Sequence, residues 1–474
     1  MAGIIVRPRA RILHGHDWVY ATEILKTFGS PVDGDLVSIK DGRDHLLGMG
    51  IYNSRSQIVV RRISRHRQEL DEDFFSRRIA QALEYRRRAG CRSDLGRLIW
   101  SESDGLPGVI ADRYGSVLVL RTLTLAMDRH KGLIASLLAA ATGATCVIER
   151  NDAPVRVAEG MDLTTGILFG ENSGPIEVET AGVRFLVDSL AGHKTGLYLD
   201  QVESYGIVAA LANGRSVLDC FSNQGGFALA CAKAGATAVT AVESGAESVA
   251  RLRENVTRNE LDVNVRASDV FDFLRNTDRP EYDIIILDPP SFTKARGKVG
   301  DALRGYRDLH ARAAKLLSKN GTLVTFSCSH HVAGHEFENA ISEGLYDARR
   351  NMRLTRRLAQ PSDHPVVLGL PETEYLKGLT INADDVTFRE EVIIDGNLVI
   401  HATGKVIFAS GVTLKNGGSL TIDGATQIDF QSFSTLTLEG NGNVLLEADE
   451  INLPSYANGF NYCCSKKPNP TIQI

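Results

Sequence analysis

The chain has 474 residues, of which 43% are hydrophobic and 23% are charged, a composition typical of a folded globular protein. No apolar run approaches the roughly 20 residues that a membrane-spanning helix needs, and early arginines interrupt the apolar amino end before it resembles a secretory signal. The seven cysteines include no C-x-x-C metal pair, which favours reduced thiols in the cytoplasm and no bound metal.

The net charge of −5 is unevenly distributed along the chain. Residues 380–474 contain 5 Lys and Arg against 11 Asp and Glu, whereas residues 1–68 contain 11 against 6. The acidity therefore belongs mainly to the carboxyl end, and the basic amino end permits an RNA partner.

Residues 1–68 alternate apolar and polar side chains in short runs separated by glycine, which predicts a small β-barrel. Its arginines cluster near the two ends of the segment, close to His14, His16 and Trp18. Such a cluster is either a face for phosphates and stacked bases or a solvated basic surface. The arginines are Arg7, Arg9, Arg11, Arg61, Arg62, Arg65 and Arg67.

Residues 69–179 predict an α/β middle domain. Its first helix spans residues 69–89, and Arg86–Arg88 near its end suit the negative end of the helix dipole. The apolar side of this helix is expected to contain Phe74, Phe75, Ile79, Leu83 and Tyr85. A strand-rich stretch, a second helix around residues 127–141 and a hairpin-like stretch follow, without a recognisable catalytic set.

From about residue 182 the pattern alternates strands and helices, as in a doubly wound parallel sheet. A long helix is expected to reach Lys319, and residues 365–379 are expected to form a hairpin at the sheet edge. The expected strands are residues 216–221, 238–243, about 263–269, 282–287 and 322–331.

Beyond residue 379 the texture changes to β-branched and polar residues in alternation, with frequent glycine or Asn-Gly turns. This pattern predicts coils of a parallel β-solenoid, and a small β-sandwich is the alternative. The predicted domains are therefore residues 1–68, 69–179, 180–379 and 380–474.

Polar residues follow several strands of the alternating segment, where ligands bind in open α/β sheets. The turn Asp219–Gly226 contains glycines that let backbone approach a ligand at a helix amino end. Because the full G-x-G-x-x-G spacing is missing, a nucleoside cofactor without a pyrophosphate fits better than a dinucleotide. Glu243 is placed to bind ribose hydroxyls, or it is simply an exposed acid at a strand end, and Asp269 suits an adenine amino group.

The buried strand 284–287 ends in Asp288-Pro289-Pro290, followed by Ser291 and an aromatic residue. The prolines stop the strand and stiffen the loop, so that a planar base fits beside the carboxylate of Asp288. The simpler interpretation is a buried strand with a proline stop. The order of glycine turn, two acids and this motif resembles class I S-adenosylmethionine-dependent methyltransferases.

Cys328 lies at the end of the next strand, in the polar run Ser327–His331. A lone cysteine on an apolar strand is usually inert, but this placement favours a thiolate. Attack of a thiolate on C6 of cytosine would make C5 nucleophilic enough to accept a methyl group. Methylation at a base nitrogen, such as guanine N7 or adenine N6, needs no cysteine and is the alternative.

Together, Asp200-Gln201 after HKTG, VLDCFSNQGGF, DPPSFTK, GYRDLHARAAKLL and SCSHH resemble the bacterial large-subunit rRNA cytosine-C5 methyltransferases of the RlmI type. The resemblance runs from about Val6 to Leu379. It implies an N-terminal PUA domain, an α/β middle domain and a Rossmann-like methyltransferase domain. It also implies S-adenosylmethionine as cofactor and a cytidine of 23S rRNA as substrate.

The resemblance further implies roles for individual residues. Cys328 would be the nucleophile, Asp288 would lie near the target base, and Lys194 would be a third catalytic group. The implied cofactor-binding residues are Asp219, Phe221, Gly225, Gly226, Glu243, Asp269, Asp288 and Gln201. The implied RNA-binding residues are Arg7, Arg9, Arg11, Lys294, Arg296 and Lys298.

The chain departs from the family pattern at three positions. Asn223-Gln224 replace an aromatic residue and a threonine, and Val202 replaces an arginine after Asp200-Gln201. Residues 380–474 have no counterpart in the family. A hypothesis of another class is a self-assembling or surface-binding protein that acts through this tail with a degenerate enzyme part, and a homodimer is also left open.

Overall fold

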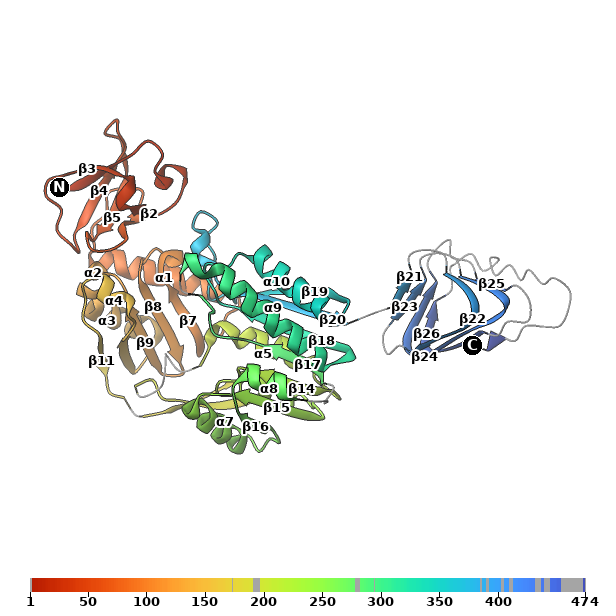
Figure 1. Ribbon diagram of the computed structural model, residues 1–474. Helices are drawn as coiled ribbons and strands as arrows, with labels where there is room; N and C mark the ends of the chain where they lie inside the picture. Colours follow the sequence, from red (N-terminus) through yellow and green to blue (C-terminus); the bar gives the residue numbers. More distant parts are fainter. Residues whose placement is uncertain are drawn as a thin grey trace.

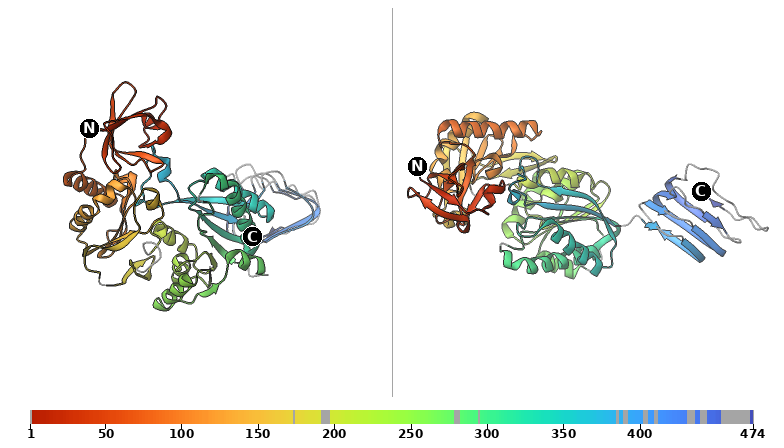
Figure 2. Two further views of the ribbon diagram at one scale, coloured as in Figure 1. Left: turned by 60° about the vertical axis from the view of Figure 1, so that its left-hand side comes forward. Right: turned by 90° about the horizontal axis from the view of Figure 1, so that it is seen from above.

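In the computed structural model, the strands of the described residues form five sheets (Figure 1). Figures 1 and 2 show the elements up to β20 gathered together and the carboxyl-terminal strands standing apart. No helix in the described part of the chain is long and apolar enough to cross a membrane. The described residues are 2–172, 174–190, 197–277, 282–293, 295–383, 386–388, 392–401, 405–408, 412–430, 436–438, 444–452 and 472–473.

The amino-terminal segment forms a six-stranded sheet of order β2-β6-β5-β4-β1-β3, in which the β1–β4 pair is parallel and the other pairs are antiparallel. Alternate residues such as Ile4, Val19 and Val37 fill its core, as the sequence pattern predicted. Its elements are β1 (Gly3–Val6), η1 (Arg11–His14), β2 (Trp18–Tyr20), η2 (Ala21–Glu23), β3 (Ile24–Phe28), β4 (Leu36–Lys40), β5 (Leu46–Tyr52) and β6 (Ile58–Ser64).

The middle region contains a five-stranded sheet of order β11-β10-β9-β8-β7. Its first helix begins at Glu72 rather than at residue 69, because Asp71 caps it by accepting a hydrogen bond from Phe74 N at 2.8 Å. Tyr85 was expected on the apolar side but is 43% exposed. The elements are α1 (Glu72–Arg88), β7 (Leu95–Trp100), η3 (Ser101–Asp104), β8 (Val109–Tyr114), β9 (Val117–Thr122), α2 (Leu125–Arg129), α3 (Lys131–Thr142), β10 (Cys146–Asn151), α4 (Val155–Ala158) and β11 (Thr164–Gly170).

A two-stranded hairpin, β12 (Ile176–Thr180) and β13 (Val183–Val187), joins the middle region to the next sheet. It crosses the predicted domain boundary between residues 179 and 180. The side chains of Val183 and Phe185 belong to the core of the following sheet. The hairpin therefore packs with the sheet that follows it, although its first strand was assigned to the middle domain.

The third large sheet has the order β16-β15-β14-β17-β18-β20-β19, with the first five strands parallel. Buried side chains of α5, α6 and α7 share one core with it, and those of α8, α9 and α10 share the other. The predicted doubly wound fold is confirmed. The elements are η4 (Leu199–Gln201), α5 (Val202–Ala209), β14 (Ser216–Cys220), α6 (Gly226–Lys233), β15 (Ala238–Glu243), α7 (Ala246–Arg258), β16 (Asn264–Ala267), α8 (Val270–Asn276), β17 (Tyr282–Leu287), η5 (Arg296–Lys298), α9 (Val299–Leu316), β18 (Leu317–Ser327), α10 (Gly334–Asp347), β19 (Met352–Ala359), η6 (Pro371–Thr373) and β20 (Lys377–Ala383).

The end of this sheet formed by β18, β20 and β19 differs from the prediction. The helix before β18 ends at Leu316, not Lys319, because Leu317 already pairs with Tyr282. No edge hairpin forms over residues 365–379. Instead, β20 inserts antiparallel between β18 and β19, and it continues past the predicted boundary at residue 380 to Ala383.

The carboxyl-terminal strands pair in parallel, as expected for a solenoid. Val392 pairs with Val412, and Val412 pairs with Leu436, so the chain returns to the same position after 20 to 24 residues. Ile394, Leu420 and other apolar side chains form the core. The strands are β21 (Val386–Phe388), β22 (Val392–His401), β23 (Lys405–Phe408), β24 (Val412–Phe430), β25 (Leu436–Leu438), β26 (Val444–Asn452) and β27 (Ile472–Gln473).

The segment between β19 and β20 connects the third large sheet to the two preceding regions. Arg86 of α1 is buried and donates a hydrogen bond to Asp363 O at 2.8 Å, so its role extends beyond the helix dipole. On the amino-terminal sheet, His16 Nε2 lies 3.1 Å from Glu372 Oε2. This connecting segment therefore ties all three regions together.

Candidate active site

The loops after β14 and β17 start side by side, where the strand order reverses. β14 pairs with β15 on one side and with β17 on the other. Asp288 N lies 3.5 Å from Cys220 O, so both loops leave the sheet at the same level. Open α/β sheets bind ligands at such a switch point. The turn after Asp219 and the motif at Asp288 are therefore brought together.

Asp219 lies near the end of β14 and is 1% exposed. Its Oδ2 accepts a hydrogen bond from Ala228 N at 3.0 Å, whereas its buried Oδ1 has no hydrogen-bond partner among the described residues. Burial raises the pKa of Asp219 to about 8, and the negative charge of Asp288 adds to this rise. An incompletely paired buried carboxyl group of this kind favours a cationic or hydrogen-bond-donating ligand.

The turn after β14 bends through three residues with positive φ, namely Phe221 (63°), Asn223 (48°) and Gly225 (94°). Asparagine tolerates this left-handed region better than most residues, which gives the departure from the family pattern at Asn223 a physical reason. Backbone strain concentrated in one short loop is typical of ligand-binding sites.

The paired glycines of this turn are required for packing. A Cβ at Gly226 would lie 2.3 Å from the ring of Tyr205, and one at Gly225 would lie 2.3 Å from Leu252. The glycines thus let α6 start close to α5 and α7. They were predicted to let the backbone approach a ligand. The close contacts that an added Cβ would make show that they are also needed for helix packing.

The two acids on the next strands hold the loops that contain them. Glu243 Oε2 accepts a hydrogen bond from Asn223 N at 2.9 Å, and Oε1 accepts one from Gly245 N at 2.7 Å. Asp269 follows β16 by two residues and caps α8, because its Oδ1 accepts a hydrogen bond from Asp272 N at 3.1 Å. A carboxylate has further lone pairs, so both acids retain acceptor capacity for a ligand.

Gln201 links the segment before α5 to the motif after β17. It is 3% exposed, and its Nε2 donates a hydrogen bond to Asp288 Oδ2 at 3.1 Å. Its buried Oε1 has no hydrogen-bond partner among the described residues. The neighbouring Asp200 accepts a hydrogen bond from Tyr375 at 2.8 Å. Gln201 and Asp288, both predicted to bind the cofactor, are therefore in direct contact.

Cys328 is half-buried directly after β18, and its Sγ lies 4.0 Å from Pro289 O in the neighbouring motif. The serines on both sides of it bind the buried hydroxyl of Tyr306, Ser327 Oγ at 2.8 Å and Ser329 Oγ at 3.0 Å. This network fixes the backbone around the thiol. It brings Cys328 to the loop that carries Asp288, as predicted.

Comparison with known proteins assigns the chain to a family. A family model described as S-adenosylmethionine-dependent methyltransferase matches residues 118–375, more than half of the chain, and a PUA-like domain matches residues 4–65. The chain belongs to the S-adenosylmethionine-dependent methyltransferases. The match begins within β9, so the family model includes part of the middle region as well as the catalytic sheet.

Two curated relatives and two solved structures illustrate the likeness. Ribosomal RNA large subunit methyltransferase I from Shewanella amazonensis is 37% identical over 77% of this chain and 94% of its own length. The protein of the same name from Shigella boydii is 37% identical over 77% and 95%. A structure assigned to a Streptococcus mutans methyltransferase covers 81% of this chain and all of its own at 22% identity and a TM-score of 0.69. A structure of methyltransferase SMU.776 with S-adenosylhomocysteine has a TM-score of 0.70 at 22% identity, with the same coverages.

The methyltransferase cofactor fits the groups at the switch point. S-adenosylmethionine carries an ammonium group, a sulfonium centre and ribose and adenine groups that donate hydrogen bonds. Asp219 Oδ1 and Gln201 Oε1, which have no hydrogen-bond partner among the described residues, are acceptors of the right kind. Glu243 ends β15 and Asp269 follows β16. These residues would hold the cofactor of this methyltransferase.

One predicted catalytic residue lies outside the described residues, and one unpredicted residue lies beside the cysteine. Lys194 is outside the described part of the chain. Lys377 begins β20, where it pairs with Ser327, and its Nζ donates a hydrogen bond to Ser329 O at 3.1 Å. Burial lowers the pKa of Lys377, and the charges of Glu374 and Cys328 oppose this shift. The only sequence signal for Lys377 was its place in the expected edge segment.

The predicted RNA-binding residues are divided among different environments. Arg7 and Arg9 are exposed, whereas Arg11 forms ion pairs with Glu23 at 3.3 Å and Glu372 at 3.7 Å. Arg296 and Lys298 are exposed in η5, and Lys294 lies outside the described residues.

Other members of the predicted basic face are internal. Arg61 pairs with Glu102 at 2.7 Å, and Arg62 pairs with Asp17 at 2.7 Å. Trp18 donates its indole hydrogen bond to Glu102 at 2.9 Å instead of presenting it to solvent. The prediction that Arg61, Arg62 and Trp18 form an exposed basic face is therefore wrong. Arg61 and Trp18 bind Glu102 of the middle region, and Arg62 binds Asp17 of the amino-terminal region.

Proposed function

We propose that this methyltransferase forms 5-methylcytidine in 23S rRNA through a covalent adduct of Cys328. The observation that carries the proposal is the contact of Cys328, after β18, with Pro289 next to Asp288, after β17. Ribosomal RNA large subunit methyltransferase I, the name of the curated relatives, supports the large-subunit rRNA as substrate.

The proposed reaction assigns each residue a step. The Cys328 thiolate forms a bond to C6 of cytosine, and the displaced electron pair makes C5 nucleophilic. Asp288, hydrogen-bonded to the N3 edge, stabilises the adduct. S-adenosylmethionine, when bound, would supply the methyl group to C5 and leave as S-adenosylhomocysteine. A base then removes the C5 proton, and the S–C6 bond breaks to return the thiolate.

Lys377 is proposed to favour the thiolate of Cys328. A positive charge near a thiol lowers the free energy of its ionised form. The hydrogen bond from Lys377 Nζ to Ser329 O, at 3.1 Å, anchors the ammonium group next to the residue that follows the cysteine. Lys194, which was predicted from the family resemblance, remains a proposed catalytic group beside Cys328 and Asp288.

The test uses 23S rRNA transcribed with 5-fluorocytidine, because fluorine at C5 cannot leave as a proton and the S–C6 bond then persists. Wild-type protein with S-adenosylmethionine is expected to give an adduct stable in SDS. Cys328→Ala should give none and should lose about 10⁴-fold or more in kcat. Cys91→Ala, which removes a half-buried thiol of the middle region, is the matched control and should behave as wild type.

The alternative product is a base methylated on nitrogen. Mass spectrometry of nucleosides from methylated 23S rRNA separates 5-methylcytidine from 7-methylguanosine and N6-methyladenosine. Full activity of Cys328→Ala, or a nitrogen-methylated product, would overturn the cysteine mechanism.

The tail is proposed as a site of association between copies of the chain. One observation favours this: β21 and β22 begin the stack of parallel strands, and Ile393 and Val399 of β22 are about half exposed. Such strand edges promote pairing with another chain. Light scattering of the full chain and of a chain ending at residue 383 tests the idea, and the same monomer mass in both would contradict it.

A further inference from the structure

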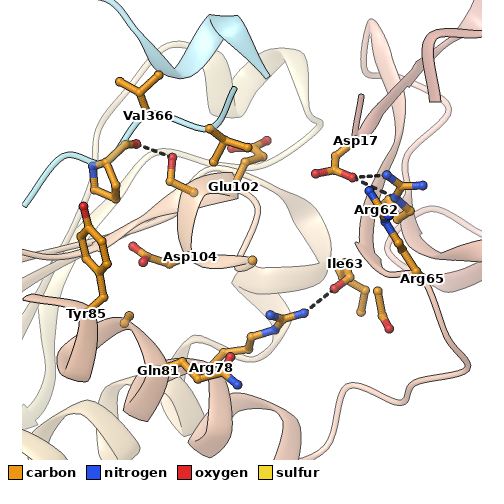
Figure 3. Close-up of a pocket in the computed structure, with 16 residues that line it drawn as sticks. Asp17, Arg62, Ile63, Arg65, Arg78, Gln81, Tyr85, Glu102, Asp104 and Val366 are labelled. Atoms are coloured by element: carbon orange, nitrogen blue, oxygen red, sulfur yellow. Dashed lines mark hydrogen bonds and ion pairs between the residues drawn. The ribbon is translucent and has the colours of Figure 1, made fainter. Parts of the chain in front are cut away.

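A cleft of about 560 Å³ lies where the amino-terminal sheet, helix α1 and the segment after β19 meet (Figure 3). Its volume is in the range of ligand pockets. It is separate from the switch point, because none of the predicted catalytic or cofactor residues lines it. The lining residues that matter below are Arg65, Arg78, Gln81, Tyr85 and Val366.

The carboxylates in this cleft are already neutralised by other cations. Asp17 binds Arg62 at 2.7 Å, and Asp104 binds the buried Arg86 at 2.6 Å. Glu102 likewise belongs to the Arg61 ion pair described above. The acidic groups of the lining therefore add little free negative charge.

Two arginines of the lining, Arg65 and Arg78, form no ion pair with the described residues. Arg65 is exposed just after β6, and neither it nor Arg78 has a carboxylate within 4.0 Å among the described residues. Arg78 is half-buried and donates one hydrogen bond to Ile63 O at 2.8 Å. Burial lowers the pKa of Arg78, the charge of Arg77 adds to the effect, and the charge of Asp17 opposes it. The cleft thus contains two guanidinium groups that take no part in the ion pairs of the described residues, and Asp17 acts on Arg78 only from a longer distance.

Apolar and hydrogen-bonding side chains lie beside this charge. Tyr85 is 43% exposed and Val366 is 41% exposed, which leaves apolar surface for a planar ring. Gln81 lies between Arg78 and Tyr85 on α1, as Figure 3 shows, and supplies both a donor and an acceptor. A phosphate site next to an aromatic surface and an amide is the combination that binds single-stranded nucleotides.

We propose that this cleft binds one single-stranded nucleotide of the RNA substrate, with its phosphate at Arg65 and Arg78 and its base against Tyr85. The proposal rests on the proposed function, because it assumes that RNA is the substrate. The cleft would hold RNA away from the reacting cytidine, so it affects RNA affinity and not the chemical step.

The test compares adjacent arginines of one helix. Arg78→Gln is expected to weaken binding of fluorescently labelled 23S rRNA fragments about tenfold in anisotropy titrations. The slope of the logarithm of the binding constant against the logarithm of the salt concentration should decrease in magnitude by about one, because one phosphate contact is lost. Arg77→Gln is the matched control, because Arg77 is exposed and pairs with Asp73 at 3.0 Å. It should change affinity less than twofold.

Three further variants test whether the effect of Arg78→Gln comes from altered folding, because that substitution also removes the hydrogen bond to Ile63 O. Arg65→Gln removes an exposed charge and should weaken binding severalfold. Tyr85→Ala should weaken it about tenfold, and Tyr85→Phe should restore most of the affinity, since stacking needs only the ring. Unchanged RNA affinity in Arg65→Gln and Tyr85→Ala would overturn the proposal.

Kinetics and a competitor distinguish this proposal from its alternatives. Arg78→Gln should raise KM for RNA while kcat stays near wild type, whereas Cys328→Ala should lose kcat with RNA affinity intact. Absence of methylation by wild type would refute the proposed function and leave the anisotropy result standing. A cleft specific for free nucleotides would bind CMP or AMP through Arg78 and leave RNA affinity unchanged in the variants, which would also overturn the proposal.

Discussion

On the β14–β16 side of the switch point, the carboxyl groups accept hydrogen bonds from backbone N–H groups, whereas on the β17–β18 side Asp288 contacts a side chain and Cys328 a backbone carbonyl. Asp219, Glu243 and Asp269 each accept a hydrogen bond from the backbone of a loop or helix. Asp288 accepts one from the Gln201 side chain, and Cys328 faces Pro289 O.

This difference separates two kinds of function. The β14–β16 side, which we propose binds the cofactor and call the cofactor side, contains a turn whose backbone is held by its own acids. The β17–β18 side, which we propose binds the target base and call the base side, holds Asp288 and Cys328 on a framework fixed by neighbours such as Tyr306. Substitutions on the cofactor side should therefore change binding and stability together, and substitutions on the base side should change the chemical step alone.

The largest expected effect among the carboxyl groups is that of Asp288→Asn. Asparagine keeps the shape of the side chain but loses its charge, so kcat should fall by about 10²- to 10³-fold. Cofactor affinity, measured by calorimetry, should change less than twofold. The control is Asp308→Asn, which alters an exposed carboxylate of α9 that binds Arg312.

Asp288 also tests where the two sides meet, since it was predicted for both roles. A loss of cofactor affinity comparable to the loss of kcat would assign Asp288 to the cofactor side. The division into a cofactor side and a base side would then not fall between β14 and β17.

Asp219→Asn should weaken cofactor binding about tenfold and stabilise the protein without cofactor at pH 8. The folded-state pKa of Asp219, about 8, is above the ordinary value near 4, so the native state retains a proton that the unfolded chain releases. The free energy of unfolding therefore falls as the pH rises from about 4 to about 8. Asparagine removes this dependence, and thermal melts should show a Tm higher than wild type by roughly 5 °C at pH 8.

Asp283 of β17 provides a control of opposite sign. Although burial opposes the shift, hydrogen bonds from Ser216 N and Oγ hold the pKa of Asp283 below its usual value. Its stabilising contribution is present above about pH 4 and is lost as the pH falls through the lowered pKa. Asp283→Asn should therefore lower Tm at pH 8, and equal changes in both variants would contradict the assignment of Asp219.

The sequence identified groups that belong to single strand ends, because a buried run followed by an acid or a glycine turn is a local pattern. Asp219, Glu243, Asp288 and Cys328 were found in this way. The doubly wound fold and the parallel tail were likewise visible in local periodicity.

Groups that depend on distant pairing were missed. Lys377 binds Ser329 O, next to Cys328, because β20 lies antiparallel between β18 and β19, and a pattern of residues does not specify that insertion. Tyr375 contacts Asp200 across 175 positions for the same reason. Arg61 was misassigned to the surface because its acidic neighbour, Glu102, belongs to another region.

Glu243→Gln should have a smaller effect than Asp219→Asn. Glutamine keeps one acceptor for Asn223 N or Gly245 N but turns an N–H donor toward the other, which costs about 1 kcal/mol. Cofactor affinity should fall about fivefold, with kcat at saturating cofactor unchanged. Glu247→Gln, on an exposed residue of α7 that pairs with Arg251, should leave both values as in wild type.

The smallest expected effect is at Asn223, where φ is +48°. Asn223→Gly relieves the conformational demand and loses only the contact from Gln224 N to the side-chain oxygen, so cofactor affinity should stay within twofold. Asn223→Ala must adopt a left-handed conformation that costs about 1 kcal/mol, so affinity should fall about fivefold. Equal affinities of the two variants would mean that the turn relaxes freely, and the cofactor side would then be no more rigid than the base side.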